Sequence, residues 1–190
     1  MAMAGVGAEK LKGNETHREY RYFQSWLDHA ALLAERFYRE CDDDPFAYNE
    51  TASVSLLCSA AMASGQLALA EFTQEKRGIG RGRRYVRGRW DMWMGTDRFH
   101  CGLEFKQIKT RFTADRLEQV MAAAVRCAAA IEKTHTDRRL GCLIATPRGE
   151  GAMHRRALAN LKAFAQECDY AWRIDAGDGH CRTFLFFRYV

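Results

Sequence analysis

The sequence predicts an α/β protein in which a mixed sheet is flanked by helices. Three observations predict this class: long stretches with apolar residues at helical spacing, shorter stretches in which polar and apolar residues alternate, and turn signals between them. The chain has 190 residues and two prolines, Pro45 and Pro147, so regular elements are seldom interrupted. This length suits one domain with a layered core.

Two helices are expected in the N-terminal part of the chain. Residues 1–15 lack an apolar period, and we expect a flexible tail there. Residues 16–41 carry aromatic and aliphatic side chains at helical spacing, and the acidic run before Pro45 ends that helix. A second helix is expected over residues 51–74, apolar almost all round, with Glu71 in its last turns.

A β-hairpin with one apolar and one polar face is expected next. Residues 84–94 and 98–108 both alternate with a period of two, and a Gly-Thr-Asp turn separates them. Glu104 and Lys106 leave the same face of the second strand because they are two positions apart. Asp91 lies on the polar face of the first strand, so the hairpin is predicted to bring these charged groups together.

The remaining chain predicts two helices and three strands. The helices are expected over residues 114–133 and 152–168, and the strands over 139–145, 170–175 and 182–189. A strand, a helix and another strand in succession imply a crossover connection and a partly parallel sheet. No linker divides these elements, so residues 16–190 are predicted to form a single domain.

The net charge and the cysteine content limit the classes of protein to which this chain can belong. Lys and Arg exceed Asp and Glu by 29 − 24 = 5, a mild excess whose distribution matters more than its total. Seven cysteines occur without a CxxC pair, which is typical of buried free thiols in a reducing cytosol. No apolar stretch resembles a secretory or membrane segment, so we expect a cytoplasmic protein without membrane contact.

The polar face of the hairpin is the candidate site for chemistry. Asp91 and Glu104, held on adjacent strands, would form a hard oxygen site suited to Mg²⁺ or Mn²⁺. A divalent cation would remove the repulsion between the two carboxylates. Lys106 beside them would orient the attacking water, help deprotonate it, or offset charge on a phosphate.

These residues carry a resemblance to a known family. Asp91 and, thirteen positions later, Glu104-Phe105-Lys106 resemble the D…(D/E)xK motif of the PD-(D/E)XK nuclease superfamily, which has the restriction-endonuclease-like fold. The expected core order, helix, two strands, helix, strand, also resembles that family's core. The resemblance implies metal binding by Asp91, Glu104 and the Phe105 carbonyl, a catalytic Lys106, and a helical Glu that Glu71 would match. It further implies hydrolysis of phosphodiester bonds, of DNA rather than RNA.

A basic segment just before Asp91 indicates a nucleic-acid partner. Between residues 76 and 89 there is no Asp or Glu, and glycines interleave the cations, so the backbone can approach a polyanion. We expect Arg116 and Gln119, early in the following helix, to reach phosphate as well. The arginines of the segment expected to contact nucleic acid are Arg81, Arg83, Arg84, Arg87 and Arg89.

Two alternatives stand beside a Mg²⁺-dependent nuclease. The first is an inactive or partner-dependent nucleic-acid-binding module, for which the aromatic helix Tyr20–Phe37 offers a surface to a partner protein or to a second copy in a homodimer. The second is a structural or small-molecule-binding protein in which Glu104 and Lys106 form a plain ion pair. In that case the basic segment is a solvated loop.

Overall fold

The computed structural model describes residues 6–76, 86–177, 179 and 181–190, with the backbone alone at 74–76, 86 and 87. Seven strands form one sheet in the order β1-β6-β7-β5-β4-β3-β2. The helices are α1 (Tyr20–Cys41), α2 (Glu50–Ala63), α3 (Ala114–Ala129) and α4 (Gly151–Ala165), with short 3-10 turns at Pro45–Ala47 and Lys133–His135. The strands are β1 (Ala8–Lys12), β2 (Leu67–Lys76), β3 (Val86–Thr96), β4 (Phe99–Ile108), β5 (Arg138–Ala145), β6 (Tyr170–Ala176) and β7 (Cys181–Tyr189).

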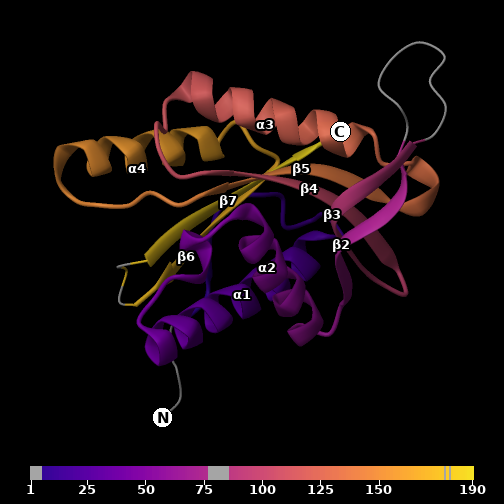
Figure 1. Cartoon of the computed structure of the whole chain (residues 1–190), viewed down its shortest axis with the longest axis horizontal. Helices are drawn as coiled ribbons and strands as arrows, with labels where there is room; N and C mark the ends of the chain where they lie inside the picture. Colours follow the sequence, from indigo (N-terminus) through magenta and orange to yellow (C-terminus); the bar gives the residue numbers. More distant parts are fainter. Residues whose placement is uncertain (1–5, 77–85, 178, 180) are drawn as a thin grey trace.

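The helices cover both faces of the sheet, which confirms the predicted class. α1 and α2 lie on one face and α3 and α4 on the other (Figure 1). The β4–β5 pair is parallel and is joined through α3, while the other neighbouring pairs are antiparallel. A crossover helix is what a parallel pair needs, because a tight turn cannot return the chain in the same direction.

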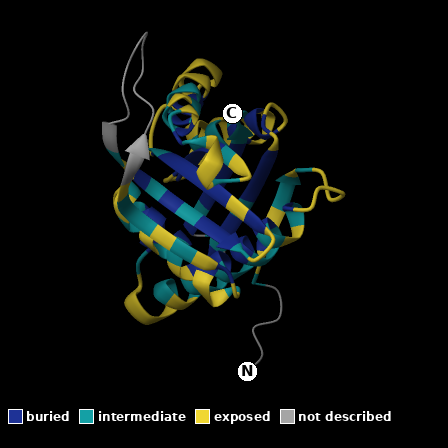
Figure 2. Cartoon of the chain, turned by 90° about the vertical axis from the view of Figure 1, so that its right-hand side faces the viewer, coloured by how far each residue is buried: buried dark blue, intermediate teal, exposed yellow. Residues whose placement is uncertain are grey.

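Two apolar cores follow from this layering. The larger one lies under α1 and α2 and is rich in aromatic residues, with Phe23, Trp26 and Trp172 fully buried. The smaller one lies under α3 and α4. Figure 2 shows the buried residues gathered in the middle of the sheet. Leu67 and Leu69 on the edge strand β2 are 64% and 56% exposed.

The aromatic residues of α1 were expected to offer a partner surface, but Phe23 and Trp26 lie in the core of the domain. Phe23 and Trp26 pack on Phe187 of β7 with ring centroids 5.5 and 5.8 Å apart. The Trp26 indole also donates a hydrogen bond to the carbonyl of Leu57 in α2 at 2.7 Å. The apolar face of α1 therefore packs on the core of its own domain, as that of an amphipathic helix on a sheet does.

The N-terminal prediction needs a correction too. Residues 1–15 were expected to be a flexible tail, but Ala8–Lys12 forms β1 and pairs with β6. The amide of Ala8 also donates to the Asp28 carboxylate of α1 at 2.9 Å. The strand is short and mostly polar, so no period marked it in the sequence. The domain therefore includes residues that precede the predicted boundary at residue 16.

The predicted helix over residues 51–74 is the main error of element assignment. The helix α2 ends at Ala63, where Gly65 adopts a φ of +86° and the amide of Gln66 bonds the carbonyl of Ala61. A glycine in this conformation is a common helix terminator. The chain then enters β2, so the core order contains three antiparallel strands between α2 and α3 rather than two. Glu71 lies on a strand and not in a helix.

The described part of the chain contains no helix with the length and apolar composition needed to cross a bilayer. All seven cysteines are free, as predicted, and four of them are buried. Cys41 is exposed, so the expectation of burial does not extend to every thiol.

Candidate active site

The neighbouring strands β3 and β4 separate beside Asp91, and we call this place the fork. β3 pairs with β2 along its length but with β4 only from Met92–Leu103 to Thr96–Phe99. β4 continues to pair with β5 as far as Ile108–Ala145, so β3 and β4 separate beyond Met92–Leu103 (Figure 1). Asp91 directly precedes Met92, where the pairing of β3 with β4 begins, and Glu104 directly follows Leu103, the partner of Met92 on β4. The fork thus forms where both predicted carboxylates stand.

Asp91 holds the fork in place with its side chain. Its Oδ2 accepts a hydrogen bond from the backbone amide of Phe105 at 2.7 Å. A carboxylate therefore takes the position that a strand carbonyl would fill in an unbroken ladder. Asp91 is partly buried, and this contact fixes it against the Glu104-Phe105-Lys106 segment. The structure brings together the three residues that the motif singled out.

Glu104 is almost fully enclosed, with 3% of its surface exposed. Its register partner on β5 is Gly141, where an added Cβ would lie 2.4 Å from the backbone nitrogen of Val125 in α3. The missing side chain lets α3 approach the sheet closely at this point. Burial raises the pKa of the Cys142 thiol, and Cys101 and the carboxylates of Asp91 and Glu104 add to that rise. Both carboxylates therefore act on one buried sulfur.

Lys106 joins the fork to the start of α2. Its Nζ donates to Glu50 Oε1 at 3.0 Å and to the Phe105 carbonyl at 2.6 Å. Burial lowers the pKa of Lys106, but Glu50 and then Asp91 outweigh that effect and the pKa is raised above its ordinary value. Lys106 is consequently an ammonium at neutral pH. The Phe105 carbonyl, the expected third metal ligand, lies against that ammonium.

Glu50 is the residue that sequence reasoning missed. It occupies the first turn of α2, and its Oε2 accepts from the amide of Gln107 at 3.0 Å while Oε1 binds Lys106. The expected helical Glu was assigned to Glu71 because the helix was predicted too long. The signal that favours Glu50 is its place after Asn49, whose side chain caps the helix by accepting from the amide of Ala52 at 2.9 Å.

Glu71 still lies beside the fork, but on β2. Its neighbours Ala70 and Phe72 pair with Met92 and Trp90, so Glu71 stands opposite Asp91 in a gap of the ladder. It has a φ of +54°, which is uncommon for a residue with a side chain and which interrupts the pairing. Its carboxylate binds Arg89 at 2.6 Å and approaches the Thr51 hydroxyl at 3.5 Å. The first turn of α2 thus spans the fork, with Glu50 toward β4 and Thr51 toward β2.

The other predicted site residues are those expected to contact nucleic acid. Arg89 is exposed and paired with Glu71. Arg116 and Gln119 lie in the first turns of α3, where the Arg116 guanidinium donates to the Gln119 carbonyl oxygen at 2.6 Å. Arg81, Arg83 and Arg84 lie outside the described residues, as does the side chain of Arg87.

The donor chemistry of the fork fits a hard divalent cation. Four carboxylates, Glu50, Glu71, Asp91 and Glu104, lie around the fork with two cations, Lys106 and Arg89, for a formal charge of −4 + 2 = −2. Within the described ranges, no three His, Cys, Asp or Glu side chains form a metal-binding group. Mg²⁺ commonly binds through one or two carboxylates and completes its octahedron with waters and substrate phosphates. Asp91 and Glu104 suffice for that mode.

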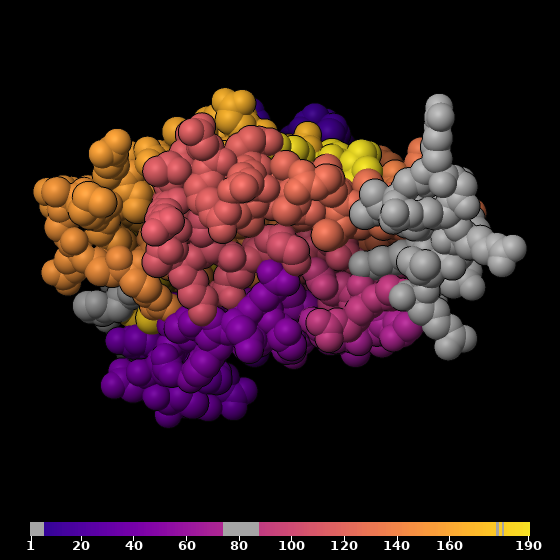
Figure 3. Space-filling model, turned by 45° about the horizontal axis from the view of Figure 1, so that its top comes forward, coloured from indigo at the N-terminus to yellow at the C-terminus, as the bar shows by residue number. Residues whose placement is uncertain are grey.

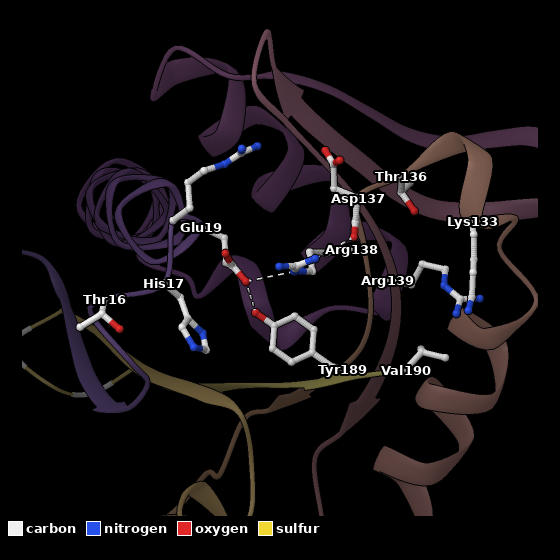
Figure 4. Close-up of a pocket in the computed structure, with 11 residues that line it drawn as sticks. Thr16, His17, Glu19, Lys133, Thr136, Asp137, Arg138, Arg139, Tyr189 and Val190 are labelled. Atoms are coloured by element: carbon white, nitrogen blue, oxygen red, sulfur yellow. Dashed lines mark hydrogen bonds and ion pairs between the residues drawn. The ribbon is translucent and has the colours of Figure 1, made fainter.

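A separate hollow lies away from the fork, at the start of β5. It measures about 790 Å³, and Figure 4 shows Glu19 of the α1 entry at its centre, bound by Arg138 and Tyr189. Burial works against the charge on Glu19, but the Tyr189 hydroxyl and Arg138 outweigh it and lower the pKa of Glu19. This network ties α1 to β5 and β7. None of the fork residues lines the hollow.

A comparison of the chain with known protein families, curated proteins and solved structures found no match. The functional assignment therefore depends on the geometry of the fork.

Proposed function

We propose that the protein is a metal-dependent nuclease that hydrolyses phosphodiester bonds of DNA at the fork between β3 and β4. The observation that carries the proposal is the meeting of Asp91, Glu104 and Lys106 where the two strands separate. The order α2, antiparallel strands, α3, β5 is also in keeping with the PD-(D/E)XK resemblance. The free thiols suit a reducing compartment, and we place the protein in the cytoplasm.

Each residue has a defined part in this proposal. Asp91 and Glu104 would hold Mg²⁺, with Mn²⁺ as a substitute and the Phe105 carbonyl as a further oxygen ligand. The ion would supply the charge that polarises a phosphoryl oxygen. Lys106, kept protonated by Glu50, would donate hydrogen bonds to the scissile phosphate or hold the attacking water. Glu50 positions Lys106 and does not touch the substrate itself.

A cleavage assay tests the proposal. Supercoiled plasmid, single-stranded DNA and single-stranded RNA are incubated at low salt with Mg²⁺, Mn²⁺ or EDTA, using the wild type and Lys106→Ala. We expect divalent-dependent cutting of DNA that falls at least about 100-fold in the variant, since loss of one preorganised charge typically has that effect. Circular dichroism controls for folding. Metal-dependent cutting that persists in Lys106→Ala contradicts the proposal.

One observation favours a second candidate, a nucleic-acid-binding module without activity. The Phe105 carbonyl, the expected third metal ligand, already accepts a hydrogen bond from Lys106 at 2.6 Å. Such a module binds DNA with a steep salt dependence and cuts nothing. The exposed Leu67 and Leu69 on the free edge of β2 would then serve a partner protein or a second copy. Cutting of DNA by the wild type without a partner protein decides against this candidate.

A further inference from the structure

A basic hollow of about 380 Å³ lies between the β4–α3 connection and the start of α4. Of the side chains that line it, one, Glu150, is a carboxylate. The positively charged lining residues are Lys109, Arg111, Arg148 and Arg156, with His154 beside them.

Two of these cations are committed to the fold and two are not. Lys109 donates to the carbonyls of Ala47, at 2.7 Å, and Tyr48, and Arg148 pairs with the buried Asp44. The guanidinium groups of Arg111 and Arg156 are exposed and bind no partner among the residues whose side chains are described. They are available to an external anion, and arginine is suited to bidentate contact with phosphate.

Arg111 has a strained backbone conformation. Its φ is +58°, a conformation that glycine adopts without cost and that a long side chain rarely adopts. The next residue, Phe112, accepts a hydrogen bond through its carbonyl from Asn160 of α4 at 2.8 Å. The connection is thereby tied to α4, so Arg111 and Arg156 face the same hollow from two linked elements. Strained residues of this kind gather at binding sites.

The hollow and the fork are close to each other along the chain. Lys109 follows Lys106 by three residues on the same chain, and Tyr48, which accepts from Lys109, precedes Glu50 by two. The same short segment before α2 therefore contacts both places. Figure 3 shows the face on which α3 and α4 lie together with α2 below them.

We infer that the hollow binds the phosphodiester backbone of the nucleic-acid strand on one side of the scissile phosphate, through Arg111 and Arg156. The inference rests on the proposed function, because it gives the fork a polymer rather than a mononucleotide as substrate. It also adds two arginines to those that the sequence singled out between residues 76 and 89.

The test is a binding measurement that needs no cleavage. Fluorescence anisotropy follows labelled DNA of about 30 nucleotides, single-stranded and duplex, over roughly 50 to 300 mM NaCl in EDTA. The proteins are the wild type, Arg111→Ala/Arg156→Ala, and the control Arg21→Ala/Arg36→Ala. The control removes the same charge from exposed positions of α1 on the other face of the sheet. A labelled dinucleotide serves as the short probe.

For the long probe, we expect the hollow variant to bind at least about tenfold more weakly and its salt slope to fall by about two, one for each phosphate contact. The control variant should match the wild type. Equal affinity and slope in the hollow variant overturn the inference, and so does a wild type that does not bind DNA. Equal loss for the dinucleotide and the long probe also overturns it, because the hollow would then hold a free phosphate or nucleotide.

The outcome also separates this inference from the proposed function. Cutting by the wild type with no effect of the hollow variant on binding removes the role of the hollow alone. Weakened binding in the hollow variant, with no cutting by the wild type, keeps the surface and removes the nuclease. A second variant, Arg111→Gly, guards against misfolding. It relieves the backbone conformation, so we expect an unchanged or higher Tm together with weaker binding of the long probe.

Discussion

Glu50 and Lys106 form the contact at the fork on which the charge of the lysine depends. Burial alone would favour a neutral amine, and Glu50 at 3.0 Å reverses that preference. The motif named Lys106, but nothing in the spacing of the sequence ties it to a residue 56 positions earlier. The pair exists because α2 begins at the fork.

Glu50→Gln tests this contact. Both side chains are about a third exposed, so solvent screens the pair and we expect a loss of about 1 kcal/mol in the free energy of unfolding. The pKa of Lys106 is raised in the folded state, so the contribution is complete below its ordinary value of 10.5 and is lost as the pH rises through the folded pKa. We therefore expect a constant difference between variant and wild type across neutral pH, measured by urea unfolding.

The matched control is Glu40→Gln, which breaks the exposed pair between Arg36 and Glu40 on α1. It should change stability by less than about 0.5 kcal/mol. NMR titration of the Lys106 side chain should show a lower pKa in Glu50→Gln. An unchanged Lys106 pKa would mean that Glu50 does not hold the charge.

At the scale of elements, the position of α3 against β5 controls the space around Glu104. Gly141 faces the α3 backbone, so a Cβ there would press on Val125 N at 2.4 Å and Cα at 2.7 Å. Backbone atoms cannot yield as a side chain can. We expect Gly141→Ala to cost about 1 to 3 kcal/mol in unfolding free energy and to reduce cleavage, because the helix must shift where Glu104 is enclosed.

Gly102→Ala is the control for that change. Gly102 lies two residues before Glu104 on β4, and an added Cβ would meet only the ends of the Ile131 and Thr136 side chains at 3.0 and 3.1 Å. These can move by a few tenths of an ångström, so the loss measured by thermal unfolding should be smaller than for Gly141→Ala. Equal losses in the two variants would show that the close approach of α3 has no special role.

The elements that the sequence predicted well are those with a buried face. The hairpin of β3 and β4 and the terminal strands β6 and β7 were predicted from their apolar residues, and these residues pack in the cores on the two faces of the sheet. The strand β2 was missed because its residues read as an extension of α2. Its Leu67 and Leu69 are exposed on a free edge, so burial imposed no period of two. Only Gly65 marked the boundary.

The candidate site also has residues that the sequence predicted and residues that it could not predict. Asp91, Glu104 and Lys106 follow from alternation and motif, because neighbouring strands of a hairpin bring like faces together. Glu50 and the left-handed Glu71 depend on where α2 ends and how β2 meets β3, which are tertiary facts. The same holds for Arg111 and Arg156, which lie 45 residues apart (156 − 111 = 45) and meet only across a hollow.

For the molecule as a whole, the Glu19 network makes stability depend on acid pH. Burial opposes the charge of Glu19, yet the Tyr189 hydroxyl and Arg138 lower its pKa below the ordinary 4.5. A lowered folded pKa gives stability that is present above that ordinary value and is lost as the pH falls through the folded one. Glu19→Gln should therefore show a flatter decline of unfolding free energy from pH 6 to pH 3 in urea titrations.

The variant should also be about 2 kcal/mol less stable at neutral pH, since a buried hydrogen-bonded charge is replaced. Glu40→Gln again serves as the exposed control and should keep the pH dependence of the wild type. If Glu19→Gln declines as steeply as the wild type toward pH 3, the acid sensitivity has another source.

We expect Asp91 and Glu104 to form a divalent metal site at the fork, and this is measured by following Mn²⁺ binding with electron paramagnetic resonance. The wild type should bind Mn²⁺, and Asp91→Asn and Glu104→Gln should each weaken binding at least about tenfold. Lys106→Met should bind Mn²⁺ as well as the wild type or better, because the removed ammonium repels the ion. Mn²⁺ binding that is absent from the folded wild type, or that survives unchanged in Asp91→Asn, would contradict the expected metal site.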